Sequence, residues 1–242
     1  MIVGNRSDAC KLCGGLGPLR RSHILPEFLY ESLYDEKHRY IGVRPNPESK
    51  NPFVQQGLRE YLLCGGCEDR LSAWETYAAD VLRNLPDTTH ARPAEVVEVR
   101  DVDYCKFKLF QLSLLWRAGV ATHASFAAAA LGPHLNTIRD LLQNEDPGHR
   151  ARYGCVLFGF RGGSVARVGR PPISCRIDGH RSLLFLMAGL IWVFIVSSHS
   201  GSMKGQGSFL GPEGILRICI GRGTAQEFLA NSGDSLMKAG VI

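Results

Sequence analysis

Cys10-Lys11-Leu12-Cys13 and Cys64-Gly65-Gly66-Cys67 are two cysteine pairs with the same spacing, and glycines lie beside both. Two thiolates separated by two residues can bind one tetrahedral ion, and two such pairs complete its four-ligand shell. Glycine tolerates the tight turns that direct backbone N–H groups at the sulfurs. We therefore predict a structural zinc ion on Cys10, Cys13, Cys64 and Cys67. The alternative, unrelated buried thiols, does not account for the repeated spacing.

Length and composition are those of an ordinary globular protein. The 242 residues suffice for one large domain or two small ones, and 45% of them are hydrophobic. No secretory signal is recognisable, and the longest apolar run, 183–196, has 14 residues where a membrane-spanning helix needs roughly 18–20. We therefore expect a cytoplasmic protein without a membrane segment, whose other cysteines are core thiols.

The order of the predicted elements indicates the α+β class. Apolar periodicity predicts helices at 68–85 and 104–120, and the second is apolar on nearly all sides, so it should be central and buried. Residues 35–51 are polar and proline-containing and should be an irregular loop. Short helices are expected at 26–33, 125–131 and 136–142, strands at 57–63, 96–99, 153–160, 173–177, 181–187, 190–197 and 214–220, and a last helix from Thr224.

These elements suggest three regions. Residues 1–85 should form the zinc-binding module, and 86–150 a helical region packed on it. Residues 151–242 should form a mostly antiparallel β-sheet with a terminal helix. Within that sheet, 183–187 and 190–196 should pair as a hairpin across Ala188-Gly189.

The segment Ser22-His23-Ile24-Leu25-Pro26 stands between the cysteine pairs. Together with them it resembles the HNH nuclease superfamily, over roughly residues 8–75. The resemblance implies a ββα-metal, treble-clef-like module at the N-terminus. In that module a hairpin carries an Asp-His-x-x-Pro segment on its first strand, and the second cysteine pair opens the following helix.

The resemblance assigns catalytic roles to two residues, and Glu60 could add a third. His23 would be the general base of phosphodiester hydrolysis. Glu68, directly after the second cysteine pair, would help to hold a catalytic Mg²⁺ or Mn²⁺. Ser22 stands where the family has an acidic ligand, and Arg59 or Glu60 stands near the family's asparagine, so Glu60 and Glu68 could together replace the missing carboxylate. The alternatives are a site that only binds, and a His23 that packs near the zinc and hydrogen-bonds a backbone group.

A second resemblance extends over residues 1–120. Ser22–Phe28, Leu62–Glu68 and Leu112–Ala118 are similar to three segments of a family of uncharacterised bacterial proteins. This resemblance implies no function.

Arginine is unevenly distributed along the chain, whose formal net charge is +5. Residues 151–181 contain six arginines and one acidic residue, Asp178, which gives this stretch alone +5. The planar guanidinium suits phosphate, so the stretch could contact nucleic acid, or it could be a solvated sheet face. Two further arginines precede His23. The predicted nucleic-acid contacts are Arg20, Arg21, Arg161, Arg167 and Arg170.

Three functions compete on this basis. The first is a metal-dependent HNH-like endonuclease that hydrolyses phosphodiester bonds in nucleic acid, DNA in preference to RNA. The second is a non-catalytic module in which zinc stabilises a surface that binds nucleic acid or another partner. The third is a subunit of a homo-oligomer or larger complex, with the apolar hairpin at 183–196 as its interface.

Overall fold

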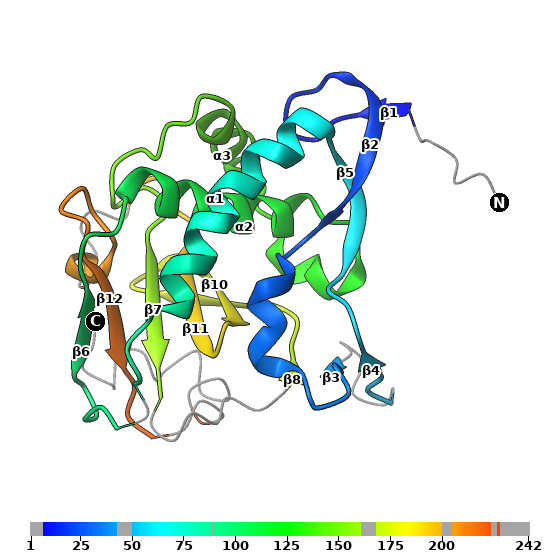
Figure 1. The fold of residues 1–242 in the computed structure, drawn as a ribbon. Coiled ribbons are helices and arrows are strands. Elements are labelled where there is room, and N and C mark those ends of the chain that lie inside the picture. The colour runs from blue at the N-terminus through cyan, green and yellow to red at the C-terminus, as the bar shows by residue number, and fades with distance from the viewer. Residues whose placement is uncertain are drawn as a thin grey trace.

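The computed structural model describes residues 7–42, 50–88, 90–160, 168–199, 205–223 and 227. The protein is mixed α+β, with a small sheet near the N-terminus and a large sheet formed mostly by the C-terminal part. The long helix α1 (Gly65–Arg83) runs from the small sheet towards the large one, with the helix α2 (Tyr104–Val120) behind it (Figure 1). The predicted fold class is confirmed at this level.

The small sheet leads directly into α1. Its strands are β1 (Ser7–Ala9), β2 (Leu16–His23) and β5 (Arg59–Cys64), in the order β1-β2-β5, and both pairings are antiparallel. α1 follows β5 without a loop and buries Leu71, Trp74 and Ala78, which share one helix face. The predicted strand and helix are confirmed, with the helix beginning at Gly65, earlier than expected.

The connection between β2 and β5 contains more structure than predicted. It starts with a 3₁₀-helix, η1 (Glu27–Leu33), after Pro26, whose fixed φ suits a helix start. The short strand β3 (Tyr40–Gly42) pairs with β4 (Phe53–Val54) and with β8 (Val168–Gly169). The expectation of an irregular loop over 35–51 was wrong for residues 40–42, because the partner strand β8 is remote in the sequence.

α2 is the central helix of the molecule. Every residue from Phe107 to Ala118 is buried, in agreement with the apolar pattern. Asp103 caps the helix by accepting a hydrogen bond from the Lys106 amide at 3.0 Å. The short helices η2 (Ala124–Ala129) and α3 (His134–Gln143) follow close to the two predicted ones. Neither α2 nor another described helix has the length and apolar character needed to cross a membrane.

The large sheet is antiparallel except at one pairing. Its strands have the order β6-β12-β7-β11-β10-β9, and only β12 and β7 run parallel among these neighbours in the described chain. The turn of the β10–β11 hairpin has positive φ at Ala188 (50°) and Gly189 (72°), as in tight hairpin turns. The strands are β6 (Val96–Val99), β7 (Cys155–Gly159), β9 (Ile173–Ile177), β10 (His180–Met187), β11 (Leu190–Ile195) and β12 (Leu216–Ile220). The predicted helix from Thr224 lies, apart from Glu227, outside the described residues.

The apolar β10–β11 hairpin is part of the interior of the chain. Phe185 and Trp192 belong to a hydrophobic cluster shared with α2, and the Trp192 ring stacks on Phe107 of that helix. Leu184 and Ile191 belong to a second cluster. We expected this hairpin to be an exposed interface, and its burial removes that argument. A homo-oligomer or larger complex stays a prediction.

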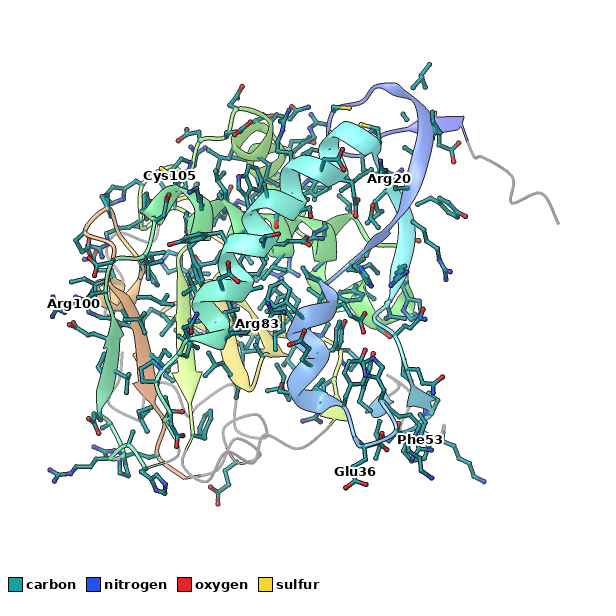
Figure 2. All side chains as sticks on the ribbon, viewed as in Figure 1. Arg20, Glu36, Phe53, Arg83, Arg100 and Cys105 are labelled. Carbon is teal, nitrogen blue, oxygen red and sulfur yellow. The ribbon has the colours of Figure 1, made fainter. Side chains whose placement is uncertain are left out.

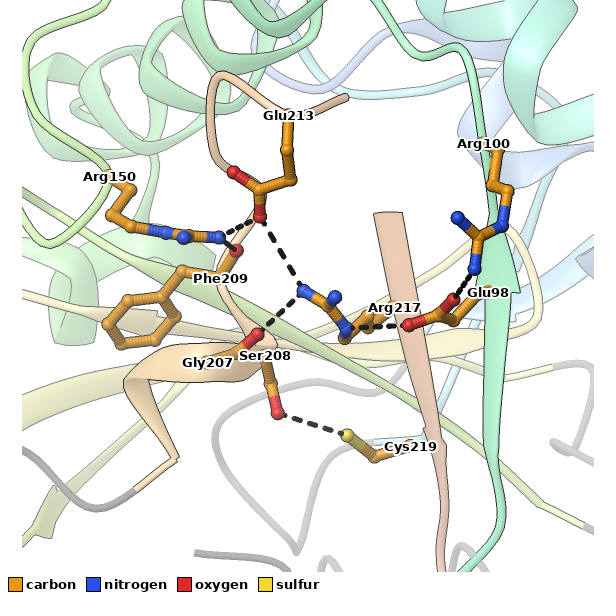
Figure 3. A network of polar contacts seen from close by, with 9 residues as sticks. All are labelled: Glu98, Arg100, Arg150, Gly207, Ser208, Phe209, Glu213, Arg217 and Cys219. Carbon is orange, nitrogen blue, oxygen red and sulfur yellow. Dashed lines mark hydrogen bonds and ion pairs between the residues drawn. The ribbon is translucent and has the colours of Figure 1, made fainter. Parts of the chain in front are cut away.

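A polar network joins two strands at one edge of the large sheet (Figure 3). Arg217 of β12 pairs with Glu98 of β6 at 3.1 Å and with Glu213 at 3.6 Å. Glu213 also pairs with Arg150. Arg217 donates in addition to the carbonyl of Gly207, in η4 (Gln206–Ser208), at 2.8 Å. These arginines therefore have structural partners.

The three predicted regions share one hydrophobic cluster. It contains Trp74 of the first region, Trp116 of the second and Trp192 of the third. In addition β6, from the second region, pairs with β12 of the third. The division into 1–85, 86–150 and 151–242 stays a prediction.

Candidate metal centre and the adjacent histidine

The four cysteines of the two pairs come together at one end of the β2–β5 hairpin. Their sulfur atoms all lie within 4.8 Å of one another, and those of Cys13 and Cys64 are 3.8 Å apart. A tetrahedral ion with Zn–S bonds of about 2.3 Å sets its sulfurs about 3.8 Å apart. The cluster could therefore bind a metal ion such as zinc.

Backbone hydrogen bonds shape this cluster. The Gly14 amide donates to the Cys10 carbonyl at 2.8 Å, and its φ of 75° favours glycine. The Lys11 amide donates to the Leu62 carbonyl at 2.9 Å and holds the first pair against β5. Burial raises the pKa of the Cys10 thiol, but hydrogen bonds from nearby backbone, including that of Cys64, outweigh it and lower the pKa to about 7. Cys10 is thus prepared as a thiolate ligand.

α1 begins at the cysteines and lies along β2. Arg20 of β2 lies against Gly65, with its Nη1 3.9 Å from Asp69 Oδ1, and Figure 2 shows it beside the first turn of α1. The fully buried Ser22 hydroxyl donates to Glu68 Oε2. Glu68 is in the first turn of α1, where the helix dipole favours negative charge. The two positions at which the HNH resemblance expects ligands of a catalytic ion are therefore in contact.

His23 lies at the other end of the hairpin, opposite Arg59 of β5. Its Nε2 is 2.7 Å from Arg59 Nε and 3.1 Å from Glu27 Oε2. An unprotonated Nε2 accepts from Arg59, whereas a protonated Nε2 donates to Glu27. These contacts of the ring are with side chains, in contrast to the alternative of a histidine bonded to backbone near the zinc.

The surroundings of His23 favour the neutral imidazole. Burial lowers its pKa, the Arg59 cation lowers it further, and the Glu27 carboxylate partly opposes both. Glu27 is itself held by the Tyr34 hydroxyl and, at 3.0 Å, by the Gly57 amide. His23 can therefore accept a proton at neutral pH.

Glu60, the other carboxylate expected at a catalytic ion, contacts the segment after α2. Its carboxylate accepts from the Thr122 amide and hydroxyl at 3.0 Å and from the His123 amide at 2.7 Å. Over the described parts of the chain, the four cysteines are the one group of three or more potential metal ligands. His23, Glu60 and Glu68 do not form such a group.

Basic residues line a groove next to Arg59. The groove has a volume of about 780 Å³, and Lys11, Arg21, Arg59 and Tyr61 line it together with carboxylates. Arg21 is exposed there. The groove therefore brings one of the two predicted arginines before His23 close to the cation that contacts the imidazole.

The arginines of 151–181 are not gathered in this groove. Arg161 and Arg167 lie outside the described residues. Arg170 is exposed and lines a separate, mainly apolar cavity of about 370 Å³. Arg176 donates to the Gly179 carbonyl at 2.8 Å, and Arg181 donates to that of Ala128 at 2.9 Å. The last two have structural partners.

Sequence reasoning did not identify three residues that contact His23. Glu27 and Arg59 contact the ring, and Arg117 Nη1 donates to the His23 carbonyl at 3.2 Å. Arg117 did carry a signal, because a charged residue inside an apolar helix requires a buried partner. No feature of the sequence distinguishes Glu27 and Arg59 from exposed charged residues.

Comparison with protein families, with curated proteins and with solved structures finds no match to the chain. The function is therefore inferred from the residues of the site.

Proposed function

We propose that the protein is a metal-dependent endonuclease of the HNH type, which hydrolyses phosphodiester bonds in nucleic acid, DNA in preference to RNA. One observation supports this most: β2, β5 and α1 carry the four cysteines at one end and His23 at the other, with Ser22 against Glu68 between them. We assign this arrangement to the ββα-metal, treble-clef-like class.

The proposed zinc has a structural role. Cys10 and Cys13 precede β2, Cys64 ends β5, and Cys67 lies in the first turn of α1. An ion on these four thiolates would fasten both strands to the helix start, and its closed shell would leave no position for substrate.

His23 acts as general base in the proposed reaction. Its Nε2 takes a proton from a water molecule while the water oxygen forms a bond to phosphorus. The bond from phosphorus to the leaving oxygen breaks, and that oxygen takes a proton from solvent. Before the proton transfer to Nε2, Arg59 transfers its hydrogen bond from the ring to the substrate phosphate in the groove, which frees the Nε2 lone pair. The protonated ring then donates to Glu27.

Glu68 and Ser22 are the proposed protein ligands of the catalytic ion. Mg²⁺ is commonly held by one or two carboxylates together with water and substrate phosphate oxygens, which this pair can satisfy. When bound, such an ion would neutralise the charge that develops on the phosphate. Glu60 is not included, because its oxygens already have partners.

The test is plasmid nicking by the zinc-loaded protein with Mg²⁺ or Mn²⁺. His23→Ala should lower the rate by about 10²- to 10⁴-fold, the usual contribution of a general base. The control is His90→Ala, at an exposed histidine, which should nick like the wild type. Equal nicking by the wild type and His23→Ala would show that His23 is not the base.

The second candidate is a non-catalytic nucleic-acid-binding module, and the serine at position 22 favours it. This candidate predicts salt-sensitive binding that is indifferent to divalent cations, and no nicking. Replacing Lys11 and Arg21 with alanine should reduce the slope of log K against log salt by about 2. The same measurement on Arg161, Arg167 and Arg170 replaced together tests the other predicted contacts; an unchanged slope in both variants would contradict binding through these residues.

A further inference from the structure

The end of the hairpin that carries His23 is attached to the C-terminal end of α2 through both of its strands. Arg117 of α2 donates to the His23 carbonyl on β2 at 3.2 Å. Glu60 on β5 accepts from the backbone of Thr122 and His123, directly after α2. Figure 1 shows the segment after α2 beside β5.

Arg117 has the contacts of a residue that connects three elements. Its side chain is 1% exposed, and its Nη2 is 2.6 Å from Glu75 Oε1 of α1. Its Nε lies 3.4 Å from the Ser113 carbonyl, within α2. The guanidinium thus joins α1, α2 and the main chain of His23.

Packing alone does not explain an arginine at this position. Removing a guanidinium from water is unfavourable, and a well-packed apolar side chain could fill the same space in a helix that is otherwise mostly apolar. What an apolar side chain could not do is hold Glu75 and the His23 carbonyl at once. The planar fork of arginine can, whereas lysine offers a single charged nitrogen.

We propose that Arg117 is a positioning residue, which fixes the main chain of His23 so that the imidazole stays between Arg59 and Glu27. Its importance for catalysis rests on the proposed function of His23. The positioning itself does not, because it concerns the place of a ring in the folded protein.

The test variant is Arg117→Lys, which keeps the charge beside Glu75 and loses the second arm of the fork. The control is Arg83→Lys, the same change at an exposed arginine of α1. Two quantities are measured on zinc-loaded protein: kcat and KM of plasmid nicking, and the position of the His23 ring signal in ¹H–¹³C spectra at pH 8, assigned with His23→Ala.

Arg117→Lys should lower kcat by about 10- to 100-fold with little change in KM, because small displacements of a catalytic group have effects of this size. It should also shift the His23 ring signal, whereas Arg83→Lys should change neither quantity. A ring signal unchanged from the wild type would overturn the proposal, whatever happens to kcat. In an active enzyme, a shifted signal with unchanged kcat would overturn the importance of this positioning for catalysis.

The positioning can still be tested if the wild type does not nick DNA or if Arg117→Lys does not fold. Absence of nicking by the wild type would count against the proposed function, and the ring signal of Arg117→Lys would still decide the positioning. If Arg117→Lys does not fold, Arg117→Met combined with Glu75→Gln removes both charges together and leaves no unpaired buried charge. The same two quantities are then measured on that variant, with the same outcomes.

Discussion

At the scale of single residues, the two buried cations Arg117 and Lys108 of α2 differ in the partner that compensates their charge. Arg117 pairs with Glu75, so its charge is compensated. Lys108 is 1% exposed and its Nζ donates to the Tyr153 carbonyl at 2.6 Å. A carbonyl compensates an ammonium less than a carboxylate does. Burial accordingly lowers the pKa of Lys108 to about 8.

Lys108 should make the stability of the protein depend on pH in the alkaline range. Between pH 8 and 10.5 the unfolded chain binds the lysine proton and the folded chain does not, so the free energy of unfolding rises with pH. The total rise is about 3 kcal/mol at roughly 1.4 kcal/mol per pKa unit. Below pH 8 lysine is charged in both states and the contribution is constant.

Urea denaturation of the wild type and Lys108→Met over this pH range measures the effect. The difference in unfolding free energy between them should move in favour of the wild type as pH rises. Lys106→Met, at a more exposed lysine of the same helix, is the control for a lysine-to-methionine change on α2. A constant difference between the wild type and Lys108→Met would mean that the pKa of Lys108 is not lowered.

Glu60→Gln distinguishes a role in attaching the hairpin from a role as a metal ligand. An amide offers one acceptor oxygen to Thr122 and His123 instead of two, so the free energy of unfolding should fall by about 1–2 kcal/mol. If the nicking rate of Glu60→Gln is lower than that of the wild type, extra Mg²⁺ should not restore it. Restoration by Mg²⁺ with unchanged stability would instead identify Glu60 as a ligand. The control is Glu36→Gln, at the exposed carboxylate labelled in Figure 2.

At the scale of elements, the hairpin of β2 and β5 is held at both ends. The four cysteines lie at the end where β5 passes into α1, which the proposed metal ion would hold, and Arg117 and Glu60 hold the other end on α2. Ser22 and Glu68 add a contact between these ends. Loss of the cysteine end should therefore loosen the start of α1 without removing the attachment to α2.

Removal of the proposed zinc tests this at the cysteine end. In Cys13→Ser the zinc content should fall below the one ion per chain expected of the wild type. The melting temperature should fall by about 5 °C or more, because metal binding contributes to folding free energy. Cys105→Ser should change neither, because Cys105 lies outside the cluster; it is exposed, so the expectation that it is a core thiol was wrong. Elemental analysis and thermal denaturation are the measurements. Purified wild type without zinc, never exposed to chelators, would contradict the metal centre.

At the scale of the whole molecule, the core passes through all three predicted regions. Trp74, Trp116 and Trp192 belong to one hydrophobic cluster, although they come from α1, α2 and β11. Shared burial couples the elements, because none can leave the cluster without exposing apolar surface of the others. We therefore expect one cooperative unfolding transition.

Each tryptophan can report this transition separately. Three variants that each keep one tryptophan and carry phenylalanine at the other two positions are unfolded in urea, with fluorescence and circular dichroism recorded together. Within each variant, the two midpoints should coincide. An earlier transition at Trp74 than in the circular dichroism of the same variant would mean that the N-terminal region unfolds on its own.

The sequence by itself determined the local elements and the cysteine cluster. The spacing of Cys10, Cys13, Cys64 and Cys67 predicted one group of sulfurs, and the apolar patterns predicted α1 and α2. Ala188-Gly189 predicted the turn of the β10–β11 hairpin. These features follow from contacts among near neighbours or from a repeated ligand pattern, which a single chain displays directly.

Only the tertiary structure decided which partner each polar side chain has. Glu60 was expected at a metal ion and contacts Thr122 and His123, and β3 pairs with a strand far along the chain. His23 was identified as a residue of interest, but its contacts with Arg59 and Arg117 depend on how β5 and α2 pack. The sequence shows the same charged residue whether its partner is solvent or a distant element, so only long-range packing determines which of the two it is.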